Sequence, residues 1–349
     1  MRTSKLVALA FLGALLGAPG AARAGETRDG GIGDFREVVR EATKKVFPAV
    51  VFVKCIQESH EEGRKEGAEV TGSGVLISAT GEFVTNWHVV DQAREVRCLL
   101  FDGRAFHAKM LGSDKDTDVA LGRLVVPEGT APFPFAPLGD SDALVEGDFV
   151  MAMGAPWGMS RSVSLGIVAC TRRYLPGTSE YSLWVQTDAS ISPGNSGGPL
   201  VSTTGTVVGL NARGMSMGGD LGFAIPSATV RLIADQIREH GKTRWSWTGL
   251  RLQPLRDFER DTYFPGSDGV VVAGTDPDSP ARKAGLQTQD RLLALDGVPL
   301  NALTIEDLPA VQRRLGLLPL EKPATLRVRR GTEEMDLTLV PRDKGAVQG

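Results

Sequence analysis

Residues 188–200 read DASISPGNSGGPL, and this stretch carries the clearest chemical pattern in the chain. Its central Ser196 is flanked on both sides by glycines, which permit a sharp turn and a close approach of a second chain. Such a turn points the N–H groups of Gly194 and Ser196 at one place, where they stabilise a developing oxyanion. A plain glycine-rich turn is the alternative, but the length of the stretch favours a nucleophilic serine with an oxyanion hole at Gly194, Asn195 and Ser196.

A nucleophilic serine needs a base, and the chain has four histidines. His88 lies in the apolar run FVTNWHVV (83–90), where a strand ends and an imidazole can be aimed into a cleft. His60 lies in a charged segment, His107 follows a turn and His240 lies at a helix end, so we expect these three on the surface. The sequence therefore predicts His88 as the base. A purely structural histidine would be preferred only if no acid and nucleophile accompanied it.

The acid that orients this base must be fixed and partly buried. In DKDTDVAL (114–121), Asp118 directly precedes an apolar run, whereas Asp114 and Asp116 belong to the preceding turn. The order histidine, aspartate, serine along the chain is that of chymotrypsin-type barrels and differs from that of subtilisins and α/β-hydrolases. We therefore expect His88, Asp118 and Ser196 to form a catalytic triad.

The segments around these residues read as many short strands. From Val50 onward, apolar runs such as AVVFVKCI, GVLIS and SVSLGIVAC alternate with glycines and charged loops. This spacing is typical of an all-β sandwich or barrel. We therefore expect a mainly β fold, followed from about Gly249 by a second, smaller set of strands and helices.

Two helices and one loop complete the expected outline. FREVVREATKKV (35–46) opens at Asp34 and ends before Pro48. SATVRLIADQIREHG (227–241) is expected to begin with Ser227 as its N-cap and to end at Gly241. The charged stretch ESHEEGRKEGAE (58–69) is read as a solvated loop.

The first residues have the pattern of a secretory signal peptide. MRTSKLVALAFLGALLGAPGAARA places Arg2 and Lys5 before an apolar run and ends in Ala-Arg-Ala. The apolar run is too short to span a bilayer as a helix. We therefore expect cleavage after Ala24, export and no stable membrane span; an uncleaved anchor is the alternative.

Composition narrows the class of partner. The chain has 349 residues, of which 42% are hydrophobic and 23% charged, and its formal net charge is -3. No basic field supports binding of nucleic acid or an anionic membrane, so a protein or peptide partner is expected. The three cysteines, Cys55, Cys98 and Cys170, lie in or beside apolar segments without metal-ligand spacing. We expect buried thiols, no metal and no cofactor, while the disulfide state stays open.

Around the three candidate triad residues, the sequence resembles the HtrA/DegP family of trypsin-like PDZ proteases. The resemblance extends over nearly the whole chain after the leader. The blocks that carry the likeness are GSGV (72–75), TNWHVV (85–90), TDVAL (117–121), GNSGGPL (194–200) and GFAIP (222–226), in family order. Trp87, Ser192 and Gly122 depart from the family pattern. These departures bear on fine specificity and leave the triad intact.

The resemblance implies a mainly β fold: a chymotrypsin-like double β-barrel, made of two six-stranded barrels with the triad in the cleft between them, followed by a small α+β PDZ domain. It also implies a serine endopeptidase with a defined specificity pocket. Its walls would be Ser190, Ile191 and Ser192 on one side and Leu221, Gly222 and Phe223 on the other. No acid stands at the expected base of this pocket, so we expect cleavage after small or medium aliphatic residues. Cleavage after lysine or arginine is not expected.

From about Gly249 the chain resembles a PDZ domain, on GVVV (269–272), DSPARKAGL (278–286) and DRLLALDG (290–297). In that reading, a peptide's C-terminus is received by Gly249, Leu250, Arg251 and Leu252. A domain that only braces the protease is the alternative. The expected division is signal peptide (1–24), lead-in and helix (25–48), trypsin-like serine protease domain (49–245) and PDZ domain (249–342).

The resemblance also implies unfolded or misfolded exported proteins as substrates, in protein quality control and the stress response. It implies a periplasmic location and a homotrimer built through the N-terminal part of the protease domain, with Phe35 as a contact. Two rival functions remain. The chain could be a dormant peptide-binding or chaperone-like scaffold, with segments 154–165 and 188–195 keeping the oxyanion hole collapsed until a ligand binds. It could also be an esterase, which the chain order and the PDZ-like domain disfavour.

Overall fold

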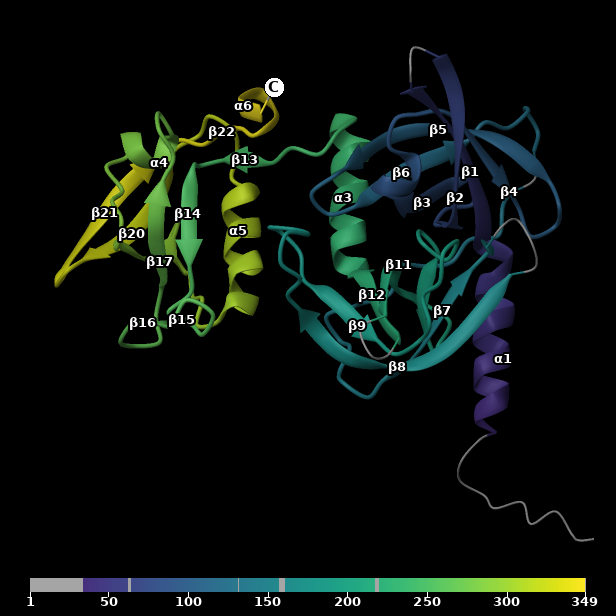
Figure 1. Ribbon diagram of the computed structural model, residues 1–349, viewed down its shortest axis with the longest axis horizontal. Coiled ribbons are helices and arrows are strands. Elements are labelled where there is room, and N and C mark those ends of the chain that lie inside the picture. The colour runs from purple at the N-terminus through teal and green to yellow at the C-terminus, as the bar shows by residue number, and fades with distance from the viewer. Residues whose placement is uncertain (1–33, 62–63, 131, 157–160, 217–219, 349) are drawn as a thin grey trace, which may run out of the picture.

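The computed structural model describes residues 34–61, 64–130, 132–156, 161–216 and 220–348. The expected signal peptide and the lead-in up to residue 33 lie outside these described residues. The described chain forms two β-barrels and a smaller sheet domain, with the helix α3 (Ser227–His240) running between them in the view of Figure 1.

The first barrel is closed, with strand order β1-β2-β3-β6-β5-β4 and antiparallel neighbours. Its elements are β1 (Val50–Glu61), β2 (Arg64–Leu76), β3 (Glu82–Asn86), the short helix α2 (Trp87–Val90), β4 (Ala93–Leu99), β5 (Ala105–Asp114) and β6 (Val119–Leu124). His88 is the second residue of α2, which follows β3 directly. Asp118 immediately precedes the first residue of β6.

One sequence expectation for this barrel is wrong. The stretch expected to be a solvated loop at 58–69 is largely a hairpin, in which the β1–β2 ladder runs without a break from Val50 opposite Val75 to Glu61 opposite Arg64. The buried end of the ladder fixes the register, and Lys54 pairs with Glu69, its diagonal neighbour on the other strand, at 2.6 Å. Charged composition therefore did not prevent strand pairing.

The second barrel is also closed, with order β10-β11-β12-β9-β8-β7. Its strands are β7 (Phe149–Gly154), β8 (Ser162–Arg173), β9 (Trp184–Thr187), β10 (Pro199–Ser202), β11 (Val207–Ser216) and β12 (Asp220–Pro226). Ser196 lies on the loop between β9 and β10. The expected pair of six-stranded barrels is thus confirmed.

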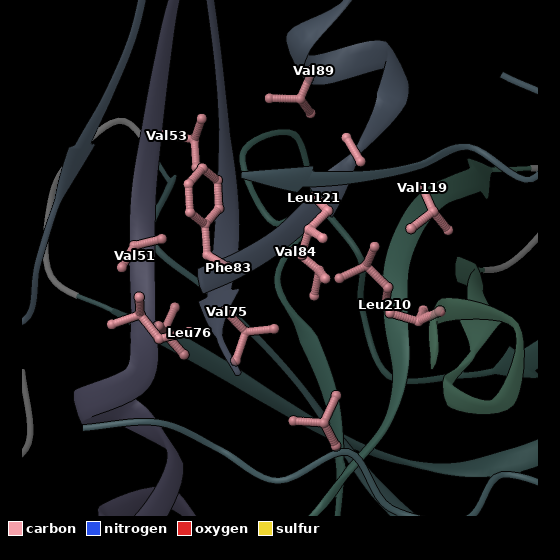
Figure 2. Close-up of a cluster of buried hydrophobic side chains, with 14 of the residues drawn as sticks. Val51, Val53, Val75, Leu76, Phe83, Val84, Val89, Val119, Leu121 and Leu210 are labelled. Carbon is pink, nitrogen blue, oxygen red and sulfur yellow. The ribbon is translucent and has the colours of Figure 1, made fainter. Parts of the chain in front are cut away.

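Both barrels are filled by branched aliphatic side chains, which pack well on a pleated surface. Figure 2 shows the cluster beneath the site, where Val84, Val89, Val119 and Leu121 from the first barrel lie with Leu210 of the second. Each of these side chains is almost completely buried. Because interiors are close-packed, this cluster fixes the backbone on both sides of His88 and Asp118.

Two helices frame the barrels. The first, α1 (Phe35–Val46), begins as expected, with the Asp34 carboxylate accepting a hydrogen bond from Arg36 N, and continues into the 3-10 turn η1 (Phe47–Ala49). The helix α3 ends as expected at Gly241, but its N-cap is Pro226 and not Ser227. Ser227 is therefore the first helical residue, and its hydroxyl donates to the carbonyl of Gly139.

The third unit is built on a sheet of order β14-β17-β18-β20-β21, with β19 paired to β18. Its elements are β14 (Leu250–Gln253), β15 (Arg256–Asp257), β16 (Thr262–Tyr263), β17 (Val270–Thr275), α4 (Pro280–Lys283), β18 (Arg291–Leu295), β19 (Val298–Pro299), η3 (Ile305–Asp307), α5 (Leu308–Gly316), β20 (Ala324–Arg330) and β21 (Glu333–Leu339).

The segments on either side of this unit pair with each other. The strand β13 (Ser246–Trp247), which enters the unit, is antiparallel to β22 (Arg342–Asp343), which leaves it, and the short helix α6 (Gly345–Gln348) follows. Residues 243–248 and 341–344 therefore form a joint between the barrels and the smaller domain.

Candidate active site

The imidazole of His88 and the carboxylate of Asp118 are in direct contact. The ring Nδ1 lies 2.8 Å from Oδ2 and 3.0 Å from Oδ1 of Asp118, and Oδ1 also accepts the backbone N–H of His88 at 3.0 Å. The carboxylate is buried, whereas the imidazole side chain is 40% exposed. A buried acid that binds Nδ1 leaves the other ring nitrogen, Nε2, as the basic atom facing the cleft.

Asp118 reaches this position through an uncommon backbone conformation. Its φ angle is 59°, in the left-handed region that non-glycine residues seldom occupy, although aspartate tolerates it better than most. Its N–H donates to the carbonyl of Lys115 at 3.3 Å, and its carbonyl accepts the N–H of Trp87 at 3.1 Å. The turn therefore aims both the side chain and the carbonyl of Asp118 at the start of α2.

The hydroxyl of Ser196 is hydrogen-bonded to the backbone and not to the histidine. The Oγ atom donates to the carbonyl of Ala212 at 3.1 Å, and no hydrogen bond joins it to His88 among the described residues. The Ser196 carbonyl accepts the N–H of Ser73 at 2.8 Å, which ties the nucleophile loop to the first barrel. Catalytic hydrogen bonds often form or tighten only when substrate binds, so this contact does not remove Ser196 as the candidate nucleophile.

The backbone N–H groups in the loop at Ser196 differ in their hydrogen bonding. Gly194 has a φ angle of 96°. No described group accepts a hydrogen bond from the N–H of Gly194 or of Ser196, so both donors are open to a ligand. The N–H of Asn195 is used differently, because it donates to the carbonyl of Ser192 at 2.9 Å. Asn195 is buried and shapes the loop, while its two neighbours present the free donors.

Ser73 braces this loop and was not identified from the sequence. Its hydroxyl donates to the carbonyl of Gly194 at 2.6 Å and accepts the N–H of Ala155 at 2.8 Å, and the residue is fully buried. One side chain of the first barrel thus joins the oxyanion loop to the end of β7. The sequence placed Ser73 in a glycine-rich block but carried no signal for this contact.

Gly197 is required where the loop passes the first barrel. Its φ angle is 82°, and a Cβ atom there would lie 2.2 Å from the carbonyl oxygen of Ser73 and 2.3 Å from Oγ1 of Thr85. Only glycine fits such a close approach without moving the backbone. The glycine beside the nucleophile therefore serves the packing of the two barrels against each other.

The residues expected to wall the specificity pocket are only partly brought together. A Cβ atom on Gly222 would lie 2.9 Å from the Ile191 side chain, so the two expected walls do meet at this pair. Ser190 and Ser192, however, line a hollow of about 280 Å³ on the β8 side of the loop. The other residues lining this hollow are Pro156, Ser162, Val163, Ser164, Pro193 and Asn195, and not Leu221, Gly222 or Phe223.

In the smaller domain, β14 is an edge strand. Leu250 and Leu252 are half-buried and pack against the hydrophobic core of the domain, while Arg251 is exposed, with its Nε 3.5 Å from the Asp276 carboxylate. Gly249 precedes the strand with a φ angle of 70°. An edge strand with alternating buried leucines is the arrangement to which an extended peptide can add.

The remaining histidines and the cysteines are outside this site. His107 is largely exposed beside Glu95, His240 is partly buried, and the side chain of His60 lies outside the described residues. Cys55, Cys98 and Cys170 are free thiols, the first two buried, and burial raises the pKa of Cys55 to about 12. In the described segments no group of three or more histidine, cysteine or acidic side chains is arranged to hold a metal ion.

Two family models match the chain. The model described as "Trypsin-like peptidase domain" matches residues 72–210, which include the histidine, the aspartate and the serine described above. The model described as "PDZ domain" matches residues 271–330 in the smaller domain. The domain types inferred from the sequence are therefore confirmed.

Similar proteins agree with these matches. DegP-like periplasmic serine endoproteases of Halomonas elongata and Pseudomonas fulva are 35% and 39% identical, over 81% and 71% of this chain and 58% and 51% of their own length. The chain thus spans about half the length of the curated relatives it matches. A solved structure of the HtrA-type protease AlgW with a tripeptide is 30% identical, has a TM-score of 0.75 and covers 87% of this chain and 97% of its own.

Proposed function

Since the chain belongs to the HtrA/DegP family of trypsin-like PDZ proteases, we propose that it is an exported serine endopeptidase that degrades unfolded or misfolded proteins. The observation that carries this proposal is the contact between His88 Nδ1 and the buried Asp118 carboxylate at 2.8 Å, beside a serine with two free backbone donors. The domain division proposed from the sequence, with the protease at 49–245 and the PDZ domain at 249–342, is compatible with the two matched ranges.

In the proposed reaction, Nε2 of His88 takes the proton of Ser196 as Oγ attacks the scissile carbonyl. Asp118 holds the imidazole in the tautomer with the proton on Nδ1 and stabilises the imidazolium that forms. The N–H groups of Gly194 and Ser196 bind the oxyanion of the tetrahedral intermediate. His88 then protonates the leaving amine, and a water molecule activated by the same base hydrolyses the acyl-enzyme.

The first specificity pocket is proposed to take small or medium aliphatic side chains. Ile191 lies against Gly222, which makes this part of the cleft apolar and narrow, and no acidic residue is among the six proposed walls. A long cationic side chain would find no partner there. Hydrolysis of a peptide library should therefore favour valine, alanine or leucine before the cut; comparable cleavage after arginine would refute the assignment.

The PDZ domain is proposed to bind peptide C-termini at Gly249, Leu250, Arg251 and Leu252, on the edge strand β14. The peptide in this site would pair with the strand, and its carboxylate would meet backbone N–H groups at the Gly249 turn. The similar HtrA-type protease AlgW, whose structure was solved with a tripeptide, supports peptide binding in this family.

A homotrimer is proposed to form through an apolar surface near α1. The rings of Phe35 and Phe149 are 4.6 Å apart, and Phe149, Val163 and Leu165 are each more than 40% exposed. The three belong to one face of β7 and β8, because Phe149 is opposite Ile167 and side chains two residues apart point the same way. Light scattering should give a trimer for the chain and smaller species for Phe149→Asp.

Export to the periplasm is proposed from the leader at residues 1–24 and from the names of the curated relatives. No helix in the described ranges is both long and apolar enough to cross a bilayer. Mass spectrometry of protein recovered from a periplasmic fraction should find Gly25 at the N-terminus. Recovery with Met1 attached would contradict cleavage after Ala24.

The proposed activity is tested with β-casein, an unfolded protein substrate. Purified protein should degrade it, and Ser196→Ala should not. A peptide with a hydrophobic C-terminus should accelerate degradation if the PDZ domain regulates the site. Absence of cleavage with and without the peptide would favour the dormant-scaffold alternative, and preference for a small ester over casein would favour an esterase.

A further inference from the structure

The turn that presents Asp118 is held from outside the barrel to which it belongs. Asp114, at the end of β5, is almost fully buried. Its Oδ2 accepts both the N–H and the hydroxyl of Thr117, at 3.0 and 2.6 Å, which closes the turn before Asp118. Its Oδ1 accepts the hydroxyl of Thr243 at 2.8 Å and the indole N–H of Trp245 at 2.9 Å. Thr243 and Trp245 belong to the segment that leads into the PDZ domain.

A second contact comes from the segment that leaves the PDZ domain. The ammonium of Lys344 donates to Oδ2 of Asp116 at 2.9 Å and to the hydroxyl of Tyr181 at 2.9 Å, and lies 3.3 Å from Glu180 Oε2. Only 8% of Lys344 is exposed. A buried lysine is uncommon unless its charge is paired, and here every contact is with the turn or with the loop that precedes β9.

The two contacts are parts of one structure. The ring of Tyr181 stacks on that of Trp245 at 4.0 Å, and the backbone N–H of Lys344 donates to the carbonyl of Trp245 at 2.9 Å. Burial alone would lower the pKa of Lys344, but its hydrogen bond with Tyr181 and the nearby carboxylates of Asp116 and Glu180 raise it. The side chain therefore stays an ammonium over the whole range in which a histidine base works.

We propose that Lys344 is a positioning residue for the catalytic acid: through Asp116, and with Trp245 on Asp114, it holds the turn that presents Asp118 to His88. This inference rests on the proposed protease function. Asp118 has a φ angle of 59°, in the left-handed region, so the direction of its carboxylate depends on the conformation of this turn. The Lys344 ion pair is the charged contact at the middle of that turn, so its loss frees the turn and misorients the carboxylate that binds Nδ1.

The test compares Lys344→Met with the parent protein and with Lys242→Met in casein or peptide hydrolysis. Lys242 is a matched control, because it lies next to the joint and pairs with Asp343 of the joint at 3.8 Å, but is exposed and touches neither the turn nor the triad. Lys344→Met should lower kcat roughly tenfold with KM unchanged, since small misplacements of catalytic groups have large rate effects. Lys242→Met should match the parent.

The pH profile separates positioning from a general loss of stability. Asp118 is the charged group in contact with the His88 ring in the described structure. A misoriented Asp118 stabilises the imidazolium less, so the acid limb of kcat/KM should move to lower pH in Lys344→Met and return in Lys344→Arg. A loss of folded protein alone would lower kcat/KM by the same factor at every pH and leave the midpoint of the acid limb unchanged. That result would overturn the proposal.

A double variant checks the route. If Lys344 acts through Asp116, the kcat of Lys344→Met with Asp116→Asn should equal that of Lys344→Met alone. Additive losses would show that the lysine acts elsewhere. If Lys344→Met does not fold, Asp116→Asn removes the same ion pair from a half-exposed position, and parent-like kcat and pH profile in that variant would equally overturn the proposal. Failure of the parent to hydrolyse casein would instead count against the proposed function.

Discussion

Replacing Ser73 with alanine should lower kcat by more than the accompanying loss of folded protein accounts for. The change removes the hydroxyl that donates to the Gly194 carbonyl at 2.6 Å and accepts the Ala155 N–H at 2.8 Å. Ala155 is fully buried, and an orphaned buried donor costs about 1–3 kcal/mol. For a domain of this size, that loss lowers Tm by about 2–4 °C per kcal/mol.

The catalytic effect follows from the Gly194 contact. Loss of one oxyanion donor costs about 10²–10³-fold in kcat, and Ser73→Ala loosens such a donor without deleting it, so we expect a fall of roughly tenfold or more. Ser227→Ala is the matched control, because Ser227 is equally buried and its hydroxyl donates to one carbonyl, that of Gly139, at 2.9 Å. Peptide hydrolysis and thermal unfolding should show a lower Tm in both variants and a lower kcat only in Ser73→Ala. Parent-like kcat in folded Ser73→Ala would refute the reasoning.

Three further outcomes are expected. Asp118→Asn should keep the fold but lower kcat about 10³–10⁴-fold in the casein assay, because an amide favours the wrong imidazole tautomer; a fall of less than about tenfold would remove Asp118 from the triad. Burial opposes ionisation of Glu82, but two bound arginines hold its pKa below the ordinary value. The ionised Glu82 therefore stabilises the folded protein at pH values above the ordinary pKa, and this contribution is lost as the pH falls through the folded-state pKa. The Tm of Glu82→Gln should therefore lie below that of the parent near pH 7 and approach it near about pH 3, and a constant gap would contradict this account. In thiol titration, Cys170 should react in the native protein, whereas Cys55 and Cys98 should react only after unfolding; three fast thiols would contradict their burial.

The candidate triad could be proposed from the sequence because each of its residues has a local signal and the three follow a known chain order. A serine among glycines, a histidine at a strand end and an aspartate before an apolar run each carry a local signal, and His88 and Asp118 are indeed in contact. The mainly β fold could be predicted for a different reason, because the short apolar runs have the length and spacing of strands. The strand pairing at 58–69 was missed because the charged composition of this stretch gives no alternating pattern, whereas the register of β1 and β2 continues through it.

The supports of the site were not predictable from local patterns. The carbonyl of Ala212 accepts the Ser196 hydroxyl, and a backbone acceptor has no sequence signature. Lys344 and Asp116 are 228 positions apart, so only the folded chain shows that they meet. Serine is common at N-cap positions, yet Ser227 donates its hydroxyl to the Gly139 carbonyl and the N-cap of α3 is Pro226. In each case a tertiary partner decides the role that the residue type alone leaves open.

The most direct test of the central claim is covalent modification with diisopropyl fluorophosphate, followed by peptide mass spectrometry. An activated serine with a free oxyanion hole reacts, whereas ordinary serines do not. One adduct should form, on the peptide that contains Ser196, and it should be absent from His88→Ala under the same conditions. Casein degradation without an adduct, or an adduct on another serine, would contradict the assignment of Ser196 as the nucleophile.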